Sequence, residues 1–302
     1  MGYMRCFSWA LSTLGIPVAI FGDFVTGRRA TSTTPTNTAI MVAQPEVTLT
    51  HLNQADGSAT YTHNGYSIIG AVNGPIEVQR RDEMPEEAAI EVNVRPAAGV
   101  GSPKERHLET LLHNTLHSII LTRLIPRTLV QITLQIRSLP EEETSTGVNT
   151  SLTILPHLLH TALLALLSAS IPLSTTLTSI LIAIPSSPST TSATPFIQPT
   201  ANELLRAKPV RSTHVFAFSG KRKMLLSESE GNFSYEEWAE ASELAENLCC
   251  GEEDEEDEGG IKLGDDEAMD IDGQAQSQSL EKWLREVVRK KVEHEQRWKT
   301  AT

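Results

Sequence analysis

Alternation of apolar and polar side chains predicts two half-buried strands in the first half of the chain. Ile90, Val92 and Val94 would point inward, alternating with Glu91 and Asn93 as in a strand with one face on a core. Pro96 ends this strand, because proline cannot donate a hydrogen bond to a ladder. A second run with the same period extends from 129 to 136.

A helix is predicted soon after the first strand. Ser102 is an N-cap residue, Pro103 occupies the first helical position, and Glu105 stands three residues after the cap. Leucine and isoleucine then recur at steps of three and four, which is the spacing of one buried helical stripe. We therefore expect a helix that begins at Pro103 and continues to about Leu124, where Pro126 stops it.

The same patterns predict the remaining elements. In chain order they are a meander over 48–72 with turns at Gly57 and Asn64-Gly65, a buried helix over 155–168, a core strand over 177–184, a hairpin over 215–226 and a helix opened by a capping box at Ser234. This mixture of strands and helices predicts an α+β fold, with helices packed on a mixed sheet. Loops are expected at 140–149 and 185–195.

Composition then divides the chain into four parts. We expect a poorly ordered extension over 1–46, a folded domain over 47–250, a disordered acidic linker over 251–278 and an amphipathic helix over 279–299. Residues 252–272 hold twelve acidic residues and one lysine, and therefore most of the net charge of −13. The remainder is close to neutral, so charge alone does not mark a nucleic-acid binder.

Both ends of the chain leave alternatives open. Residues 6–22 are apolar but interrupted by Pro17, so they are a secretory signal, an ill-defined extension or a mistaken start to the gene model. Three cysteines cannot build a disulfide framework, which favours a reducing compartment over secretion. The terminal helix should dock on a partner or on its own body rather than on a membrane, because its polar face is not uniformly basic.

Residue spacing alone indicates few candidate functional sites. His113 and His117 lie four residues apart on the first helix, as two zinc ligands would, but no third ligand is indicated. The loop from Gly99 to Gly101 precedes a helix N-terminus but lacks the phosphate-binding glycine patterns. We expect neither a metal nor a cofactor.

Several separated motifs resemble one family. They are GPIEVQRRDEMPEEAAIEVNVRP (74–96), ERHLE (105–109), Pro126-Arg127, the strand at 129–135, ALLALLSASIPL (162–173), ADGSA (55–59), STHVFAF (212–218) and GNFS (231–234). Taken in chain order, they resemble the RNase PH-like ring subunits of the eukaryotic RNA exosome, over roughly 47–250. The resemblance implies an RNase PH-like fold, also described as ribosomal protein S5 domain 2-like.

The resemblance also implies which positions would carry catalysis. Active members cleave RNA from its 3′ end with inorganic phosphate, which they hold with an arginine on the first helix and a Thr-Arg pair at the start of the second. Asn114, and Ile154 with Leu155, stand at those positions in this chain, and the two assisting aspartates are replaced by Gln198 and Leu204. These side chains offer neither charge nor a guanidinium fork. The resemblance therefore implies a retained fold with a lost active site.

The function implied is structural. The chain would join other RNase PH-like ring subunits and cap subunits to form an RNA channel, in the nucleus and nucleolus and also the cytoplasm, with no membrane partner. Basic residues that could contact RNA, or simply be solvated charges, are Arg80, Arg81, Arg95, Lys104 and Arg106. The alternatives are an active phosphate-dependent 3′–5′ exoribonuclease, and a secreted or free-standing binding module.

Overall fold

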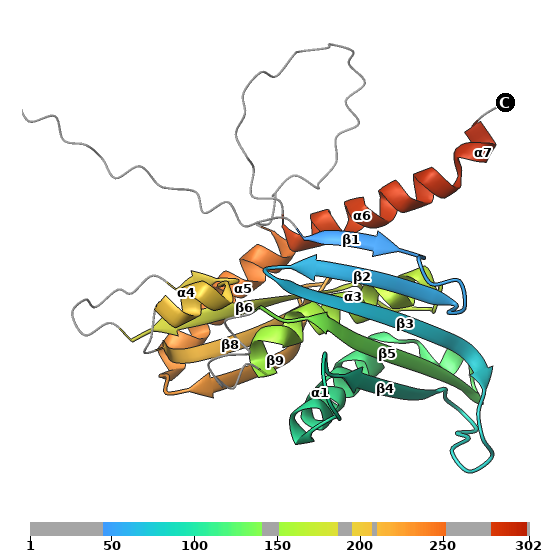
Figure 1. The fold of residues 1–302 in the computed structure, drawn as a ribbon, viewed down its shortest axis with the longest axis horizontal. Helices are drawn as coiled ribbons and strands as arrows, with labels where there is room; N and C mark the ends of the chain where they lie inside the picture. Colours follow the sequence, from blue (N-terminus) through green and yellow to red (C-terminus); the bar gives the residue numbers. More distant parts are fainter. Residues whose placement is uncertain (1–44, 141–150, 187–194, 207–209, 252–278, 301–302) are drawn as a thin grey trace, which may run out of the picture. The chain divides into compact units, whose positions relative to one another are not determined.

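The computed structural model describes residues 45–140, 151–186, 195–206, 210–251 and 279–300, which form two sheets with packed helices (Figure 1). The first sheet has the order β1-β2-β3-β5-β4, with β1 Glu46–Leu49, β2 Gly57–His63, β3 Tyr66–Glu77, β4 Ala89–Arg95 and β5 Thr128–Ser138. The second has the order β7-β6-β8-β9, with β6 Leu177–Pro185, β7 Phe196–Ile197, β8 Val210–Ser219 and β9 Met224–Gly231. The described helices are α1 Pro103–Ile119, α3 Ser151–Ser168, α4 Ala201–Arg206, α5 Tyr235–Cys250, α6 Leu280–Glu295 and α7 Arg297–Thr300, with a 3-10 turn at Thr122–Leu124.

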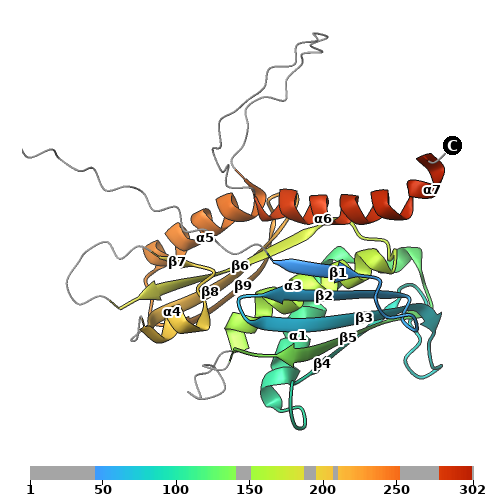
Figure 2. The same ribbon diagram turned by 45° about the horizontal axis from the view of Figure 1, so that its top comes forward.

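The first sheet is mixed, because β4 pairs with β5 in parallel while its other pairings are antiparallel. Helix α1 is the crossover that a parallel pair requires. It packs on β4, and α3 packs on β2 and β3, so both cover the same face of the sheet (Figure 2). The other face is not covered by any described helix. The predicted α+β fold with helices on a mixed sheet is confirmed.

The predicted strands and turns agree with the structure. Asn64 and Gly65 join β2 to β3 with φ angles of 51° and 84°, the left-handed conformations that a two-residue type I′ turn requires. On β5, Val130, Ile132, Leu134 and Ile136 are buried, and their polar neighbours are only partly buried. The predicted hairpin over 215–226 is confirmed as β8 and β9, which extend further in both directions.

Helix α1 begins as predicted. The N–H of Ser102 donates to the Glu105 carboxylate at 2.6 Å, and the Ser102 side chain accepts from the N–H of Lys104, so the capping box is formed. The stripe of leucine and isoleucine residues is buried against the sheet.

The predicted end of α1 near Leu124 is wrong, because the helix stops at Ile119. The carbonyl of Ile119 accepts the N–H of Ser174 at 2.8 Å, and the N–H of Leu121 donates to the carbonyl of Pro172 at 3.0 Å. The backbone groups that would have continued the helix are therefore paired with the segment that leads into β6.

Helix α3 lies in the core, in contact with β2 and β3 of the first sheet and with β6 and β8 of the second. It begins at Ser151, four residues before the predicted start at 155, because the buried face extends back to Leu152. Helix α5 packs on β6 and β8 through the buried Ala241, Ala245 and Cys249.

The first half of α6 docks on the body, which decides between the two alternatives left by the sequence. Leu284 is 1% exposed within the main hydrophobic core, and the Trp283 ring lies edge-on to Tyr61 at a centroid distance of 6.3 Å. The buried Glu281 carboxylate accepts hydrogen bonds from Thr176 (3.2 Å) and Arg285 (2.6 Å).

Several expectations concern segments outside the described residues. The predicted extension over 1–46 and the acidic linker lie almost wholly outside, as do most of the loops at 140–149 and 185–195. The proposed division into parts therefore stays a prediction. Among the described helices, none is both long and apolar enough to cross a membrane.

Candidate functional site

The two positions expected to hold a Thr-Arg pair lie in the hydrophobic core. Ile154 and Leu155 are on the first turns of α3, where they are 5% and 0% exposed within the main core cluster. Neither side chain carries a charge or a hydrogen-bond donor. Neither side chain can therefore bind a phosphate dianion, and burial of the dianion without a partner would cost several kcal/mol or more.

Gln198 is the only expected catalytic position that lines a described cavity near the start of α3. That cavity is about 10 Å³, and Thr153 and Pro156 also line it. This volume suits a single water molecule at most, so a phosphate does not fit. Gln198 is held by its backbone, whose N–H donates to Leu181 at 2.9 Å and whose carbonyl accepts from Asn64 at 3.1 Å.

Asn114 and Leu204 do not join Gln198 at the cavity. Asn114 is exposed on α1, between buried neighbours that face the sheet. Leu204 is half-buried on the short helix α4. Neither residue lines the cavity, so of the expected set only Gln198 does.

A cluster of buried histidines and tyrosines surrounds the same cavity. His157 stacks on Tyr66 with a centroid distance of 4.7 Å and lies 5.4 Å from the His63 ring, and His160 lies 5.6 Å from Tyr61. Among the described residues no group of three ligating side chains is arranged to hold a metal ion.

Burial keeps these histidines neutral. Desolvation, together with the neighbouring His63, lowers the pKa of His160 to about 3, and desolvation lowers the pKa of His157 well below its ordinary value. The Nε2 atom of His160 accepts the N–H of Ser179 at 3.0 Å, so its proton must be on Nδ1. That Nδ1 and the Nδ1 of His157 have no hydrogen-bond partner among the described residues.

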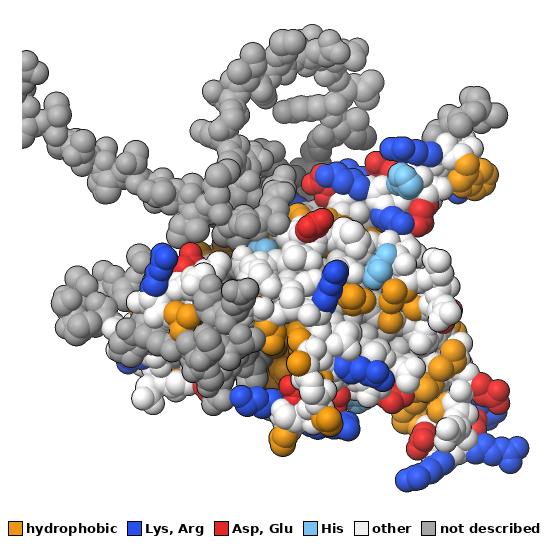
Figure 3. Space-filling view, in the orientation of Figure 1, with side chains coloured by type: hydrophobic (Ala, Val, Ile, Leu, Met, Phe, Trp, Pro, Cys, Tyr) orange, Lys and Arg blue, Asp and Glu red, His pale blue; other side chains and the backbone are white. Residues whose placement is uncertain are grey.

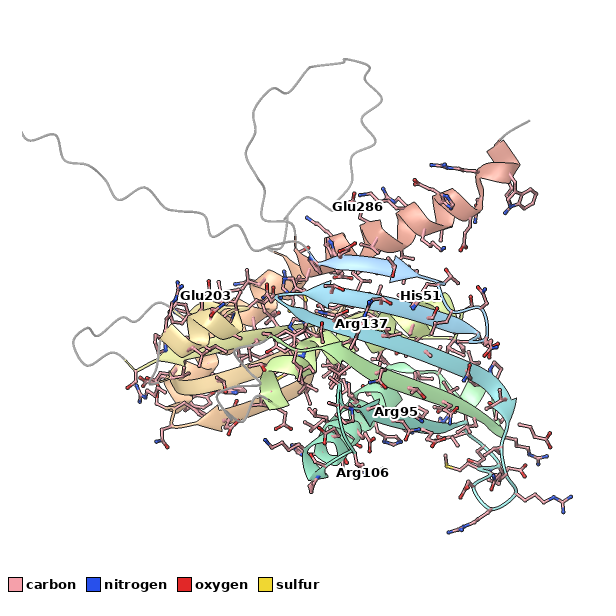
Figure 4. The ribbon with its side chains drawn as sticks, in the orientation of Figure 1. His51, Arg95, Arg106, Arg137, Glu203 and Glu286 are labelled. Carbon is pink, nitrogen blue, oxygen red and sulfur yellow. The ribbon has the colours of Figure 1, made fainter. Side chains whose placement is uncertain are left out.

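A larger cleft lies where β4 ends and α1 begins. It has a volume of about 540 Å³ and is lined by Arg95, Arg106, the loop around Gly99–Gly101, and the carboxylates of Glu105 and Glu109. Both carboxylates are engaged, because Glu105 accepts from the N–H of Ser102 and Glu109 from the N–H of Val94 (2.9 Å) and from Arg106 (3.0 Å). The guanidinium groups of Arg95 and Arg106 are exposed at this cleft (Figure 4).

The five candidate RNA-binding residues do not form one patch. Lys104 is exposed on the first turn of α1, close in the chain to Arg106 at the cleft. Arg80 and Arg81 precede β4, whereas Arg95 ends it, so β4 separates them by roughly 20 Å at 3.3 Å per residue. The cleft and the connection from β3 to β4 are therefore two separate basic surfaces.

One basic residue was missed by the sequence reasoning. Arg137 follows Gln135 on the uncovered face of the first sheet, and Gln135 pairs with Arg95, so both arginines project from the same face (Figure 4). In Figure 3 that face is otherwise mostly uncharged. The signal was available, because Arg137 continues the outward positions of the strand pattern.

Comparison with known proteins gives the family. A model of the 3′ exoribonuclease family, domain 1, matches residues 44–172. The exosome complex component RRP46 of Saccharomyces cerevisiae is 34% identical over 212 residues, which are 69% of this chain and 91% of that protein. The chain belongs to the RNase PH-like exosome components.

Solved structures share the RNase PH-like fold. Rice (Oryza sativa) Rrp46 matches with a TM-score of 0.56 and 24% identity, over 68% of this chain and 87% of that one. A chain of the Archaeoglobus fulgidus exosome with RNA bound to the active site matches with a TM-score of 0.52 and 13% identity, over 68% and 84%. The RNase PH-like fold expected from the motifs is confirmed.

The two histidines of α1 that have the spacing of zinc ligands make ordinary surface contacts in this fold. The rings of His113 and His117 stack at 6.0 Å, and His117 approaches the Glu87 carboxylate at 3.9 Å. The buried His157 and His160 were not singled out from the sequence. Their signal was that they interrupt an otherwise apolar helical run.

Proposed function

We propose that this chain is a non-catalytic, structural subunit of an exosome ring, where it supports 3′–5′ RNA degradation and processing by forming part of an RNA channel. The observation that carries the proposal is the 34% identity to RRP46 across 91% of that exosome component. Its partners are other RNase PH-like subunits, cap subunits and RNA, and it works in the nucleus, the nucleolus and the cytoplasm.

Ring assembly is tested by co-expression. Obligate interfaces commonly bury over 2,000 Å² and are apolar, so the isolated chain should self-associate or be poorly soluble. Co-expression with a second RNase PH-like subunit from the same source should give a soluble complex, measured by co-purification and light scattering. An unrelated RNA-binding protein serves as the control partner. A soluble monomer that ignores every RNase PH-like subunit contradicts the proposal.

Catalytic silence is supported by the residues at the expected phosphate positions. Ile154 and Leu155 belong to the hydrophobic core, and the cavity beside Gln198 is about 10 Å³. The positions at which we propose that the active site is lost are Asn114, Ile154, Leu155, Gln198 and Leu204.

The RNA contacts we propose for the subunit are Arg80 and Arg81 before β4, and Arg95, Lys104 and Arg106 near the cleft.

The test is a phosphorolysis assay. The co-purified complex should release no nucleoside diphosphate from single-stranded RNA in phosphate buffer above the rate of an identically prepared Asn114→Ala complex. A phosphate-free reaction separates hydrolytic contaminants. Phosphate-dependent shortening that Asn114→Ala abolishes would show an active exoribonuclease and overturn the assignment of these positions.

A further inference from the structure

The end of the C-terminal helix leaves the body of the protein. We call residues 289–299 the distal arm. Exposure increases along the helix, from 1% at Leu284 to 42% at Val292 and 74% at Trp298. In both ribbon views α6 and α7 extend past the end of β1 (Figures 1 and 2). The arm therefore contributes little to the fold of the body.

The arm is basic although the chain is acidic. It holds five basic residues and two acidic residues, whereas the whole chain has a net charge of −13. Lys290 pairs with Glu286 at 2.7 Å and Lys291 with Glu295 at 3.2 Å, and such exposed pairs contribute little free energy. Their ammonium groups can be recruited by a stronger anionic partner at small cost.

Trp298 has one cation against its ring and a second basic residue beside it in the chain. Lys299 places its ammonium 5.4 Å from the indole centroid, and Arg297 precedes the ring in the chain. An exposed aromatic residue flanked in the chain by two basic residues is a combination that binds single strands, because any base can stack on the ring while the cations contact the phosphates.

The apolar content of the arm does not fit a protein groove or a membrane surface. A helix that docks in a groove presents apolar anchors at steps of three, four or seven residues. In the arm the apolar residues are Val292 on α6 and Trp298 on α7, six residues apart, which is not the spacing of such anchors. Membrane binding also requires a broader apolar face.

We propose that the distal arm is a binding site for single-stranded RNA, with Trp298 as a stacking platform and Arg297 and Lys299 as phosphate contacts. The inference rests on the proposed function, which brings RNA to the chain. Duplex RNA should bind the arm poorly, because its bases are already stacked within the helix.

The test uses the full chain in its co-purified complex and a labelled single-stranded RNA of about 12 nucleotides. Loss of one base stack at Trp298→Ala should weaken binding by roughly 5- to 150-fold in fluorescence anisotropy. Trp298→Phe should retain most of the affinity, and Val292→Ala is the matched control on the same arm. Neutralising Arg297 and Lys299 together should reduce the slope of the logarithm of the binding constant against the logarithm of salt concentration by about 1.4.

Photo-cross-linking provides a site-specific readout, because RNA should cross-link to the peptide that contains Trp298. The inference would be overturned if Trp298→Ala and the Arg297 and Lys299 double variant left the RNA affinity and its salt dependence unchanged. It would also be overturned if these variants lost equal affinity for single-stranded and duplex RNA. Loss of subunits from the Trp298→Ala complex, with RNA affinity intact, would show a protein contact instead. Failure of the wild-type chain to co-purify with RNase PH-like subunits would refute the proposed function. The arm could still be tested by measuring RNA binding to the full chain alone, so the two failures are distinguishable.

Discussion

His157 and His160 make the core sensitive to acid. Both are neutral in the folded chain, because burial lowers their pKa values, to about 3 for His160. In the unfolded chain a histidine has a pKa near 6.5, so between these values the unfolded state binds more protons. The contribution of each buried histidine to the free energy of unfolding is therefore fully present above about pH 6.5. It is lost progressively as the pH falls below that value.

The first prediction is a specific loss of stability at pH 5. His160 alone should account for about 2 kcal/mol between pH 7.5 and pH 5, since 1.5 pH units below 6.5 corresponds to that free energy. Thermal unfolding of the co-purified complex at both pH values measures it. His160→Phe should reduce this pH dependence, and Val100→Ala, at a non-titrating position that is 93% exposed, should leave it unchanged. Equal pH dependence in all three proteins contradicts the prediction.

Sequence reasoning found the residues that lie at surfaces and missed those that meet in the interior. Arg95 and Arg106 were nominated from their charge and do line one cleft. The histidine and tyrosine cluster was missed, because His63 comes from β2 while His157 and His160 come from α3. Their proximity is a product of tertiary packing and leaves no local pattern in the chain.

At the scale of elements, capping signals predicted where α1 and α5 begin, whereas the apolar stripe did not predict where α1 ends. The capping boxes at Ser102 and Ser234 both formed, because a cap depends on residues within one turn. The end of α1 depends on Ser174 and Pro172, which lie more than fifty positions later in the chain. An apolar stripe that continues to Leu124 could not reveal that the backbone groups after Ile119 pair with this distant segment instead of continuing the helix.

Docking of α6 supplies the second prediction. Leu284 is 1% exposed in the main core, so Leu284→Ala should cost about 2–5 kcal/mol, mostly as detachment of this helix. Limited proteolysis should then cleave within 279–299 while the RNase PH-like body stays resistant. Val292→Ala, on the same helix but 42% exposed, should leave the cleavage rate unchanged. Body unfolding at the same rate as tail cleavage would show that α6 is integral to the body.

At the scale of the whole molecule, charge is separated along the chain. Residues 252–272 hold twelve acidic residues and are followed by a helix whose arm, 289–299, is basic. RNA binding depends on the neutralisation of phosphates by basic groups. We therefore expect a polyanion tethered in the same chain to compete with RNA for those groups and to lower non-specific affinity.

The last prediction concerns this competition. Residues 252–258 are all acidic, and replacing each by its amide should raise the affinity of the co-purified complex for RNA at low salt. The gain should shrink as salt rises, because screening shortens to about 8 Å at physiological ionic strength. Binding titrations at several salt concentrations measure both effects.

The matched control exchanges every glutamate in 252–258 for aspartate and every aspartate for glutamate, which preserves the charge and should leave affinity unchanged. Truncation after Cys250 is a less specific test, because it also removes α6, whose Leu284 is part of the core. If the amide variant enters the complex normally and binds RNA no more tightly at any salt concentration, the acidic segment does not compete with RNA.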